Sequence, residues 1–314
     1  MGALLFHKVG CFGKIPAQGD FLRLGATSSA IVPAFDRWLQ EGIDAGRRAG
    51  TALAPDPIYF LYRAQGVRET LVGALVPSSD SVGRSFPLAI YGFVDSALVA
   101  DGFPLVPAAC ARFLAGAVDL LLDAATLSAA DLGARLADLP LPTVEETSAA
   151  EDMRRALLNG ARVGDLVERL FAEPPPGRQF YAFRTFASAC TPLRGRDGEA
   201  DRPVLTLDCV VRSPIDRLVW LELGRRLLGW RDTPPALLWA DSPPRLLVSL
   251  GSAPSSLLLY LTKPDHGGSR LWPLATERPE AIREAAAGLR AGERAVLERP
   301  DTSLEALLTA MATP

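Results

Sequence analysis

The stretch GCFGKIPAQGDFLRL, residues 10–24, holds a lysine among closely spaced glycines, which is the composition of a phosphate-binding loop. A loop of the Walker type has four residues between its first glycine and the Gly-Lys pair, followed by Ser or Thr. Here that gap is two residues, and Ile-Pro follows Lys14. Pro16 has no backbone N–H for a phosphate, and no helix is expected to begin at Lys14. The GxGxxG pattern of dinucleotide sites is also absent, so the spacing argues against a nucleotide site.

Metal binding is limited by the scarcity of ligands. His7 and His266 are the only histidines, and the four cysteines form no CxxC pair. A zinc site needs several such side chains at short spacings. Each histidine is therefore expected to be an ordinary strand or loop residue, and we predict no metal and no cofactor.

Nucleophilic catalysis is not indicated either. The sequence has no GxSxG elbow, and a histidine partner would have to be one of only two. Cys11, beside the glycine turn, is the most suggestive thiol, but an unpaired cysteine at a strand end is more often a small buried core residue. We therefore predict no catalytic residue and a protein that is not an enzyme.

Two loops nevertheless carry more polar chemistry than core packing explains. They are the opening stretch and SSDSVGRSFPL, residues 78–88, which joins two apolar runs. Asp20 and Arg84 each stand beside apolar residues, where a lone charge is costly to bury, so we predict an ion pair between them. The alternative is a small-ligand site or enzyme in which Lys14, Asp20 and Arg84 converge on a pocket.

The segment FDRWL, residues 35–39, also combines charged and aromatic residues. Phe35, Trp38 and Leu39 have the i, i+3, i+4 spacing of one helical face, which predicts that they are buried. Asp36 then points away from that face, towards a neighbouring loop. The tryptophans at 220, 230, 239 and 272 are likewise expected to lie mostly in the core.

The elements that must position these residues alternate between strands and helices. We expect strands near 3–12, 57–64, 69–78, 85–95, 203–211, 236–241 and 245–251, and helices near 30–50, 107–125, 150–172, 178–189, 213–230, 278–289 and 302–311. Strands interleaved with long helices predict an α/β fold, a three-layer α/β/α sandwich around a mixed sheet. Residues 126–202 are read as a helical insertion.

Composition limits the remaining possibilities. The chain has 314 residues, 48% of them hydrophobic and 22% charged, with a formal net charge of −3. This supports a large buried core and gives no reason to expect nucleic acid as a partner. No run of 18 uncharged apolar residues is present, and the N-terminal apolar run is too short for a secretory signal. We therefore expect a cytoplasmic protein with no membrane insertion.

Three segments taken together resemble the TagF (ImpM) family of type VI secretion accessory proteins. The family carries G-x-x-G-K-[LI]-P-x-x-G-D-F, then D-x-W-L, then S-V-G-R-x-F-P-L. The matching residues are Gly10, Gly13, Lys14, Pro16, Gly19, Asp20, Phe21, Asp36, Trp38, Leu39, Ser81, Val82, Gly83, Arg84, Phe86, Pro87 and Leu88. The resemblance is clear over residues 8–125 and weaker over 203–275.

The resemblance implies a three-layer sandwich and a regulator without enzymatic activity. It also implies post-translational repression of type VI secretion assembly through binding of a forkhead-associated scaffold protein, with any PP2C-type phosphatase supplied by a separate chain. Residues 1–275 would form the TagF-like domain, with strands returning over 203–263, and 276–314 a helical tail. The motif residues that could form an interaction site are Lys14, Asp20, Phe21, Asp36, Trp38, Ser81 and Arg84.

Overall fold

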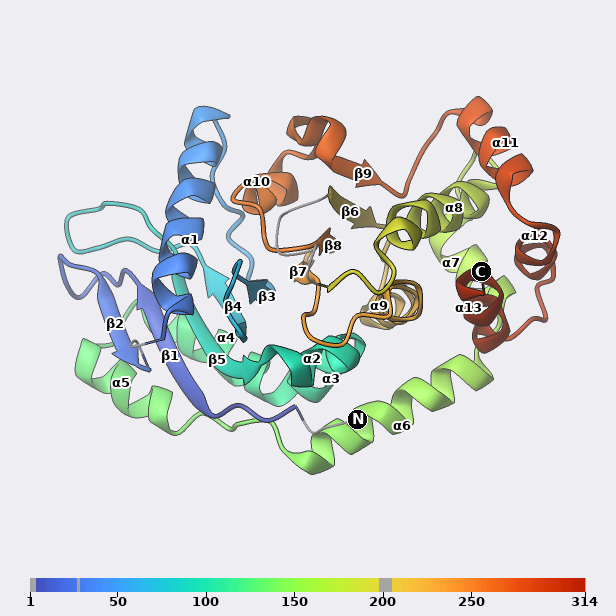
Figure 1. Cartoon of the computed structure of the whole chain (residues 1–314). Coiled ribbons are helices and arrows are strands. Elements are labelled where there is room, and N and C mark those ends of the chain that lie inside the picture. Colours follow the sequence, from blue (N-terminus) through green and yellow to red (C-terminus); the bar gives the residue numbers. More distant parts are fainter. Residues whose placement is uncertain (1–3, 27–28, 198–204, 314) are drawn as a thin grey trace.

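A single nine-stranded sheet runs through the computed structural model, which describes residues 4–26, 29–197 and 205–313. The strand order is β2-β1-β5-β4-β3-β7-β8-β6-β9 (Figure 1). All neighbouring strands are antiparallel except β6 and β9, which are parallel. The α/β fold with a mixed sheet is therefore confirmed.

The strands match the expected segments closely. Their bounds are β1 Lys8–Gly13, β2 Leu22–Gly25, β3 Ile58–Arg63, β4 Glu69–Val76, β5 Leu88–Asp95, β6 Leu205–Cys209, β7 Ala236–Asp241, β8 Pro244–Leu250 and β9 Leu271–Pro273. Strands β2 and β9 were not predicted, because each is too short to show alternation in the sequence. The first two residues of the expected strand 203–211 lie outside the described residues.

Side chains alternate between the two faces of the sheet. Along β5, Ala89, Tyr91 and Phe93 face one side, while Leu88 and Ile90 face the other. Both sets are buried, so each face must be covered by helices.

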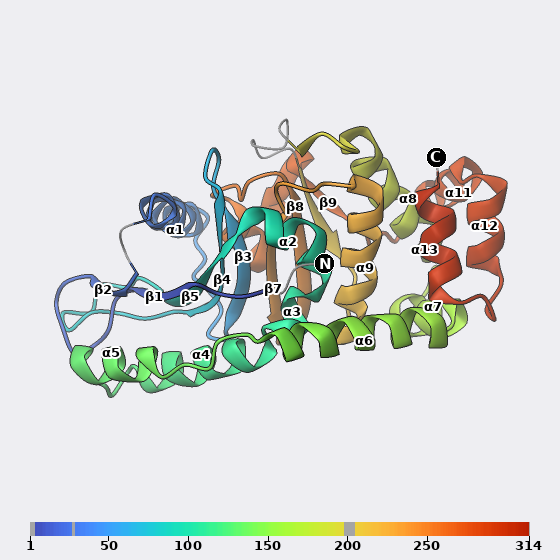
Figure 2. The same ribbon diagram turned by 60° about the horizontal axis from the view of Figure 1, so that its bottom comes forward.

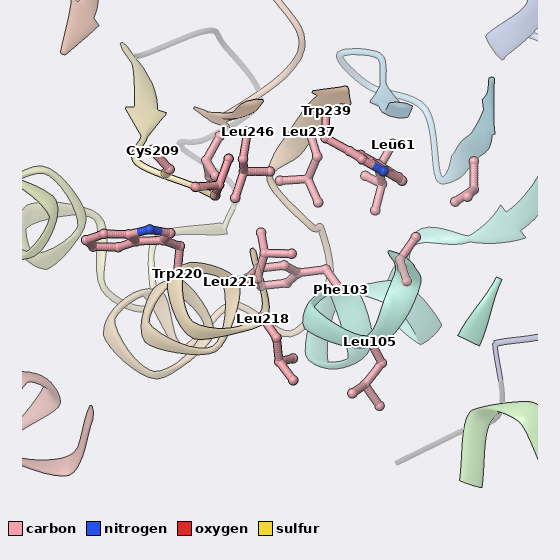
Figure 3. Packing of buried hydrophobic residues seen from close by; sticks show 14 of the residues in the cluster. Leu61, Phe103, Leu105, Cys209, Leu218, Trp220, Leu221, Leu237, Trp239 and Leu246 are labelled. Atoms are coloured by element: carbon pink, nitrogen blue, oxygen red, sulfur yellow. The ribbon is translucent and has the colours of Figure 1, made fainter. Parts of the chain in front are cut away.

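One face is covered by α1 (Ile31–Arg48) and α10 (Leu257–Thr262). The opposite face is covered by α2 (Ser96–Gly102), α3 (Val106–Ala109), α4 (Ala111–Asp123), α5 (Ala129–Ala137) and α9 (Pro214–Leu228). Figure 2 shows α4 and α5 on the side of the sheet away from α1. In Figure 3, Trp220 of α9 faces the part of the sheet that carries Cys209, and Phe103 faces the part that carries Leu237 and Leu61.

The prediction of core tryptophans is confirmed at three of the four positions. Trp220, Trp230 and Trp239 are buried, whereas Trp272 on β9 is 36% exposed. Trp272 is at the edge strand of the sheet, where one flank has no neighbouring strand.

The insertion and the C-terminal tail pack together beside α9. The insertion contains α5, α6 (Val144–Gly160), α7 (Val163–Phe171) and α8 (Arg178–Cys190), and the tail contains α11 (Pro279–Gly288), α12 (Ala291–Glu298) and α13 (Leu304–Ala312). The tail helices lie against α7 and α8 in both views (Figures 1 and 2). Helices α5 and α12 were not predicted.

A buried carboxylate on α9 connects these helices. Glu222 accepts hydrogen bonds from Arg154 of α6 and from Arg225 and Arg226 of its own helix. Arg226 also pairs with Glu305 of α13, at 2.6 Å. One acid therefore links α9 to the insertion and, through Arg226, to the tail.

The two halves of the sheet meet at β3 and β7. Residues 58–61 pair with residues 237–240, and the rings of Tyr59 and Trp239 stack with centroids 5.5 Å apart. The five strands from the first half and the four from the second are thus hydrogen-bonded into one sheet.

Across the described residues, no single helix has both the length and the apolar composition required to cross a membrane, although the bent pair Ser96–Ala109 and Ala111–Asp123 passes that test jointly.

Candidate interaction site

The two polar loops singled out in the sequence meet in one place, which we call the motif corner and define as residues 13–23 and 78–88. Its first segment begins where β1 ends at Gly13, whose φ is +142°. A Cβ at this position would lie 2.1 Å from the carbonyl oxygen of Pro87. Gly13 therefore allows the first segment to pass directly over the second.

A buried ion pair lies at the centre of the motif corner. Lys14 and Asp80 are 6% and 3% exposed, and Nζ of the lysine lies 2.9 Å from Oδ2 of the acid. Nζ also donates to the carbonyl oxygen of Arg84, at 3.4 Å. Burial of each charge is tolerated because the other lies beside it.

The carboxylate of Asp80 has four donors. Oδ1 accepts from the backbone N–H groups of Val82, at 3.1 Å, and Arg84, at 2.8 Å. Oδ2 accepts from Lys14 and from Nε of Arg84, at 2.9 and 2.7 Å. Burial raises the pKa of Asp80, but these hydrogen bonds outweigh burial and hold the pKa well below its usual range.

The prediction that Arg84 pairs with Asp20 is wrong in its choice of acid. Within the described part of the chain, the carboxylate paired with Arg84 is Asp80. The guanidinium does reach the first loop, where Nη2 donates to the carbonyl oxygen of Gly19. Asp20 itself is exposed, and its backbone carbonyl accepts from Gln18 at 3.2 Å. The four-residue spacing brings Asp80 close to Arg84, whereas the side chain of Asp20 stays in solvent.

Backbone hydrogen bonds complete the link between the loops. The N–H of Ser81 donates to the carbonyl oxygen of Gln18, at 3.0 Å, and Oγ of Ser78 donates to that of Lys14, at 2.7 Å. Gly83 has φ +81° and closes the turn that begins at Asp80. The motif corner is therefore a single braced unit.

Three phenylalanines pack under and beside the ion pair. Phe21 stacks on Phe12, with ring centroids 5.6 Å apart, and meets Phe86 edge-on at 4.9 Å. Nζ of Lys14 lies 5.1 Å from the centre of the Phe21 ring. Phe12 and Phe86 are buried, which fixes the position of Phe21 at the surface.

The surface of the motif corner is apolar and cationic. Val82 is 69% exposed and Phe21 is 41% exposed. The side chain of Arg84 is 62% exposed even though its Nε is paired. Ser81 and Asp20 are exposed on the same two loops. Exposed apolar side chains on rigid loops are features of protein-binding surfaces.

The D-x-W-L segment supports this region from α1. Phe35, Trp38 and Leu39 are buried, as predicted. Nε1 of Trp38 donates to the carbonyl oxygen of Pro254, at 2.8 Å, which ties α1 to the segment before α10. Asp36 accepts from Arg23 at 3.1 Å and so connects the helix to β2.

Cys11 and the two histidines, which were considered for nucleophilic or metal chemistry, have different surroundings. Cys11 is fully buried, as expected for a core residue, and burial raises the pKa of its thiol to about 12. His7 contacts Glu69 at 3.1 Å, and His266 is exposed. In the three described ranges, no group of three or more His, Cys, Asp and Glu side chains gathers as a metal site would require.

Sequence reasoning missed Asp80 as the central acid of the motif corner. A usable signal was present, since Asp at the start of a turn often accepts hydrogen bonds from backbone N–H groups two and more residues later. Asp80 has this relationship to Val82 and Arg84 in SSDSVGR.

Comparison with known proteins bears on the same part of the chain. Residues 10–139 match the family model described as "TagF N-terminal domain, Type VI secretion system-associated". This part of the chain is therefore similar to the TagF N-terminal domain. The match includes both loops of the motif corner, strands β2 to β5 and all of β1 except its first two residues. The TagF-like chain is accordingly a type VI secretion system-associated protein.

A solved structure, PA0076 from Pseudomonas aeruginosa PAO1, is similar to part of the chain. The identity is 25%, the TM-score is 0.37, and the match covers 46% of this chain and 77% of the other. No curated protein sequence matches the chain.

Proposed function

We propose that this TagF-like protein is a non-enzymatic, cytoplasmic accessory protein that represses type VI secretion assembly after translation by binding a forkhead-associated scaffold protein. Its TagF N-terminal domain supports the association with the secretion system. The geometry of the motif corner supports binding rather than catalysis, and we propose its exposed surface as the contact with the scaffold.

The observation that carries this proposal is that the buried charges of the motif corner pair with each other. The amine of Lys14 and the carboxylate of Asp80 face each other and are closed off from solvent. Their hydrogen bonds hold the two loops together, so few of their donors and acceptors are left for a substrate. The side chains that the two loops expose to solvent include Phe21, Val82 and the outer part of Arg84, beside Asp20 and Ser81.

The alternative of a ligand site formed by Lys14, Asp20 and Arg84 has less support. Lys14 and Arg84 both donate to the buried carboxylate of Asp80, and Arg84 also donates to the carbonyl oxygen of Gly19. Asp20 is exposed to solvent, so the three groups do not form one site. The apolar cavity next to the motif corner is lined by Ser78, Ser85, Phe86 and Pro87 and by none of these three. A phosphatase of the PP2C type would act in the same pathway as a separate chain.

The first experiment measures binding of the purified protein to the purified forkhead-associated scaffold. Val82→Glu places a charge in the proposed contact without removing an internal interaction of the corner. Leu122→Glu is the matched control, because Leu122 is an equally apolar, 57% exposed residue on α4, across the sheet from α1. We expect Val82→Glu to weaken binding at least about tenfold and Leu122→Glu to leave it unchanged.

Each result has a distinct meaning. Absence of binding by the wild-type protein would reject the scaffold as partner. Equal binding by all three proteins would keep the partner but reject the motif corner as the contact. Repression is tested separately, by raising the level of the protein in its host and counting assembled secretion apparatuses per cell, which we expect to fall.

A further inference from the structure

A cavity of about 320 Å³ lies on the other side of the loop that carries Arg84. It is bounded by the second half of α1, the loop residues that follow α1, the loop 77–87 and α10. Its volume falls at the lower end of the range of small-ligand sites, about 300–1,000 Å³.

The lining of this cavity is apolar in its body and polar at a few points. The apolar part comes from Ile43, Leu53, Phe86, Leu258 and other nonpolar residues. The polar residues in the lining are Thr51, Ser78, Ser85 and Thr262, together with one charged residue, Arg47. An apolar body with a few polar groups is the usual composition of a site for a small organic molecule.

The space exists partly because α1 carries glycines on this side. A Cβ at Gly42 would lie 2.9 Å from Cδ1 of Leu258, so α10 approaches the helix closely there. One turn later, Gly46 also lines the cavity, and a Cβ there would lie 3.2 Å from the carbonyl oxygen of Thr51. The helices meet at Gly42, and Arg47 lines the same cavity.

Arg47 is the only charge that the lining supplies. Nη2 donates to the carbonyl oxygen of Ser85, at 3.2 Å, which holds the guanidinium against the loop 77–87. Nη1 pairs with Asp44 at 3.1 Å, but both side chains of that pair are more than half exposed, so the pair is weak. A guanidinium has five N–H donors, so several remain for a bound anion.

From these contacts we propose that the cavity binds a small amphipathic anion, an acyl or similar apolar body with a carboxylate that Arg47 receives. The apolar body would displace water from Ile43, Leu53 and Leu258. This site goes beyond the proposed scaffold contact and does not depend on it. It also differs from the ligand alternative above, since Lys14, Asp20 and Arg84 take no part.

Calorimetric titration of the full chain with octanoate tests the site, with 1-octanol as the uncharged counterpart. We expect saturable binding of octanoate and roughly tenfold weaker binding of 1-octanol, because a charge-assisted hydrogen bond contributes on that order. Leu53→Trp and Ile43→Trp each fill the cavity and are expected to abolish binding. Two filling variants are used, each checked by its Tm, so that misfolding of one does not decide the result.

The charge is tested with a matched pair of variants. Arg47→Gln and Arg48→Gln remove the same charge from adjacent exposed positions of α1, but only Arg47 lines the cavity. We expect roughly tenfold weaker octanoate binding for Arg47→Gln and no change for Arg48→Gln. The proposal is overturned if octanoate shows no saturable binding to the wild type. It is equally overturned if folded filling variants bind as the wild type does, or if the two glutamine variants bind alike.

Discussion

Nζ of Lys14 lies 2.9 Å from Oδ2 of Asp80, across 66 residues of sequence, and both side chains are buried. The pair joins the end of β1 to the loop before β5. Its hydrogen-bond partners in the same loops make it part of a larger network.

Removing both members of this pair should destabilise the protein by less than the sum of the two single removals. Lys14→Met leaves a buried carboxylate without its amine, and we expect Tm to fall by roughly 6–10 °C. The double variant Lys14→Met, Asp80→Asn should lose less than the sum of the single losses, because no buried charge is left unpaired. Differential scanning calorimetry measures all three. Additive losses would show that the pair is not coupled, and Asp44→Asn, in an exposed pair, serves as the control.

The same pair should make stability depend on pH in the acid range. The pKa of Asp80 is lowered in the folded protein, so its stabilising contribution is complete above the unfolded value, about 3.9, and is lost as pH falls through the lower folded value. We therefore expect the difference in urea midpoint between wild type and Asp80→Asn to be constant from about pH 7 to 5 and to narrow below about pH 4. A difference that widened on acidification would contradict the sign.

Two glycines of the motif corner should respond differently to alanine. At Gly13 the new Cβ would overlap the Pro87 carbonyl oxygen, so we expect Gly13→Ala to prevent folding. At Gly83 there is open space but φ is +81°, so Gly83→Ala should cost only about 1–2 kcal/mol. Yield of folded protein and urea unfolding measure the two effects. Gly160→Ala, with open space and no positive φ, is the control, and equal effects at 13 and 83 would refute the steric argument.

The network around Glu222 should govern how firmly the helical end of the molecule is held. Glu222→Gln leaves Arg154, Arg225 and Arg226 without their shared acid, and we expect a loss of about 2–3 kcal/mol, since the arginines are partly exposed. Urea unfolding measures the loss, and limited proteolysis should show earlier cleavage in the tail. Glu298→Gln, in an exposed pair with Arg294, is the control. Unchanged stability would mean that apolar packing alone holds the tail.

Much of the fold could be predicted because its signals are local. The segment 236–241 is a strand with the bounds that its apolar run indicated, and Phe35, Trp38 and Leu39 are buried as their helical spacing required. Short elements such as β2 and β9 were missed, since they are held by pairing with strands distant in sequence and have too few residues for a periodic pattern.

The sequence by itself determined most of the longer elements of this protein, the burial of their apolar faces and the three-segment pattern that resembles the TagF family. Only the tertiary structure decided which acid pairs with Arg84, that Lys14 is buried, and that a cavity opens behind the same loop. The physical reason is that spacing fixes the direction of a side chain only within one element. The partner of a charge across 66 residues depends on how two separate loops are brought together by the sheet between them.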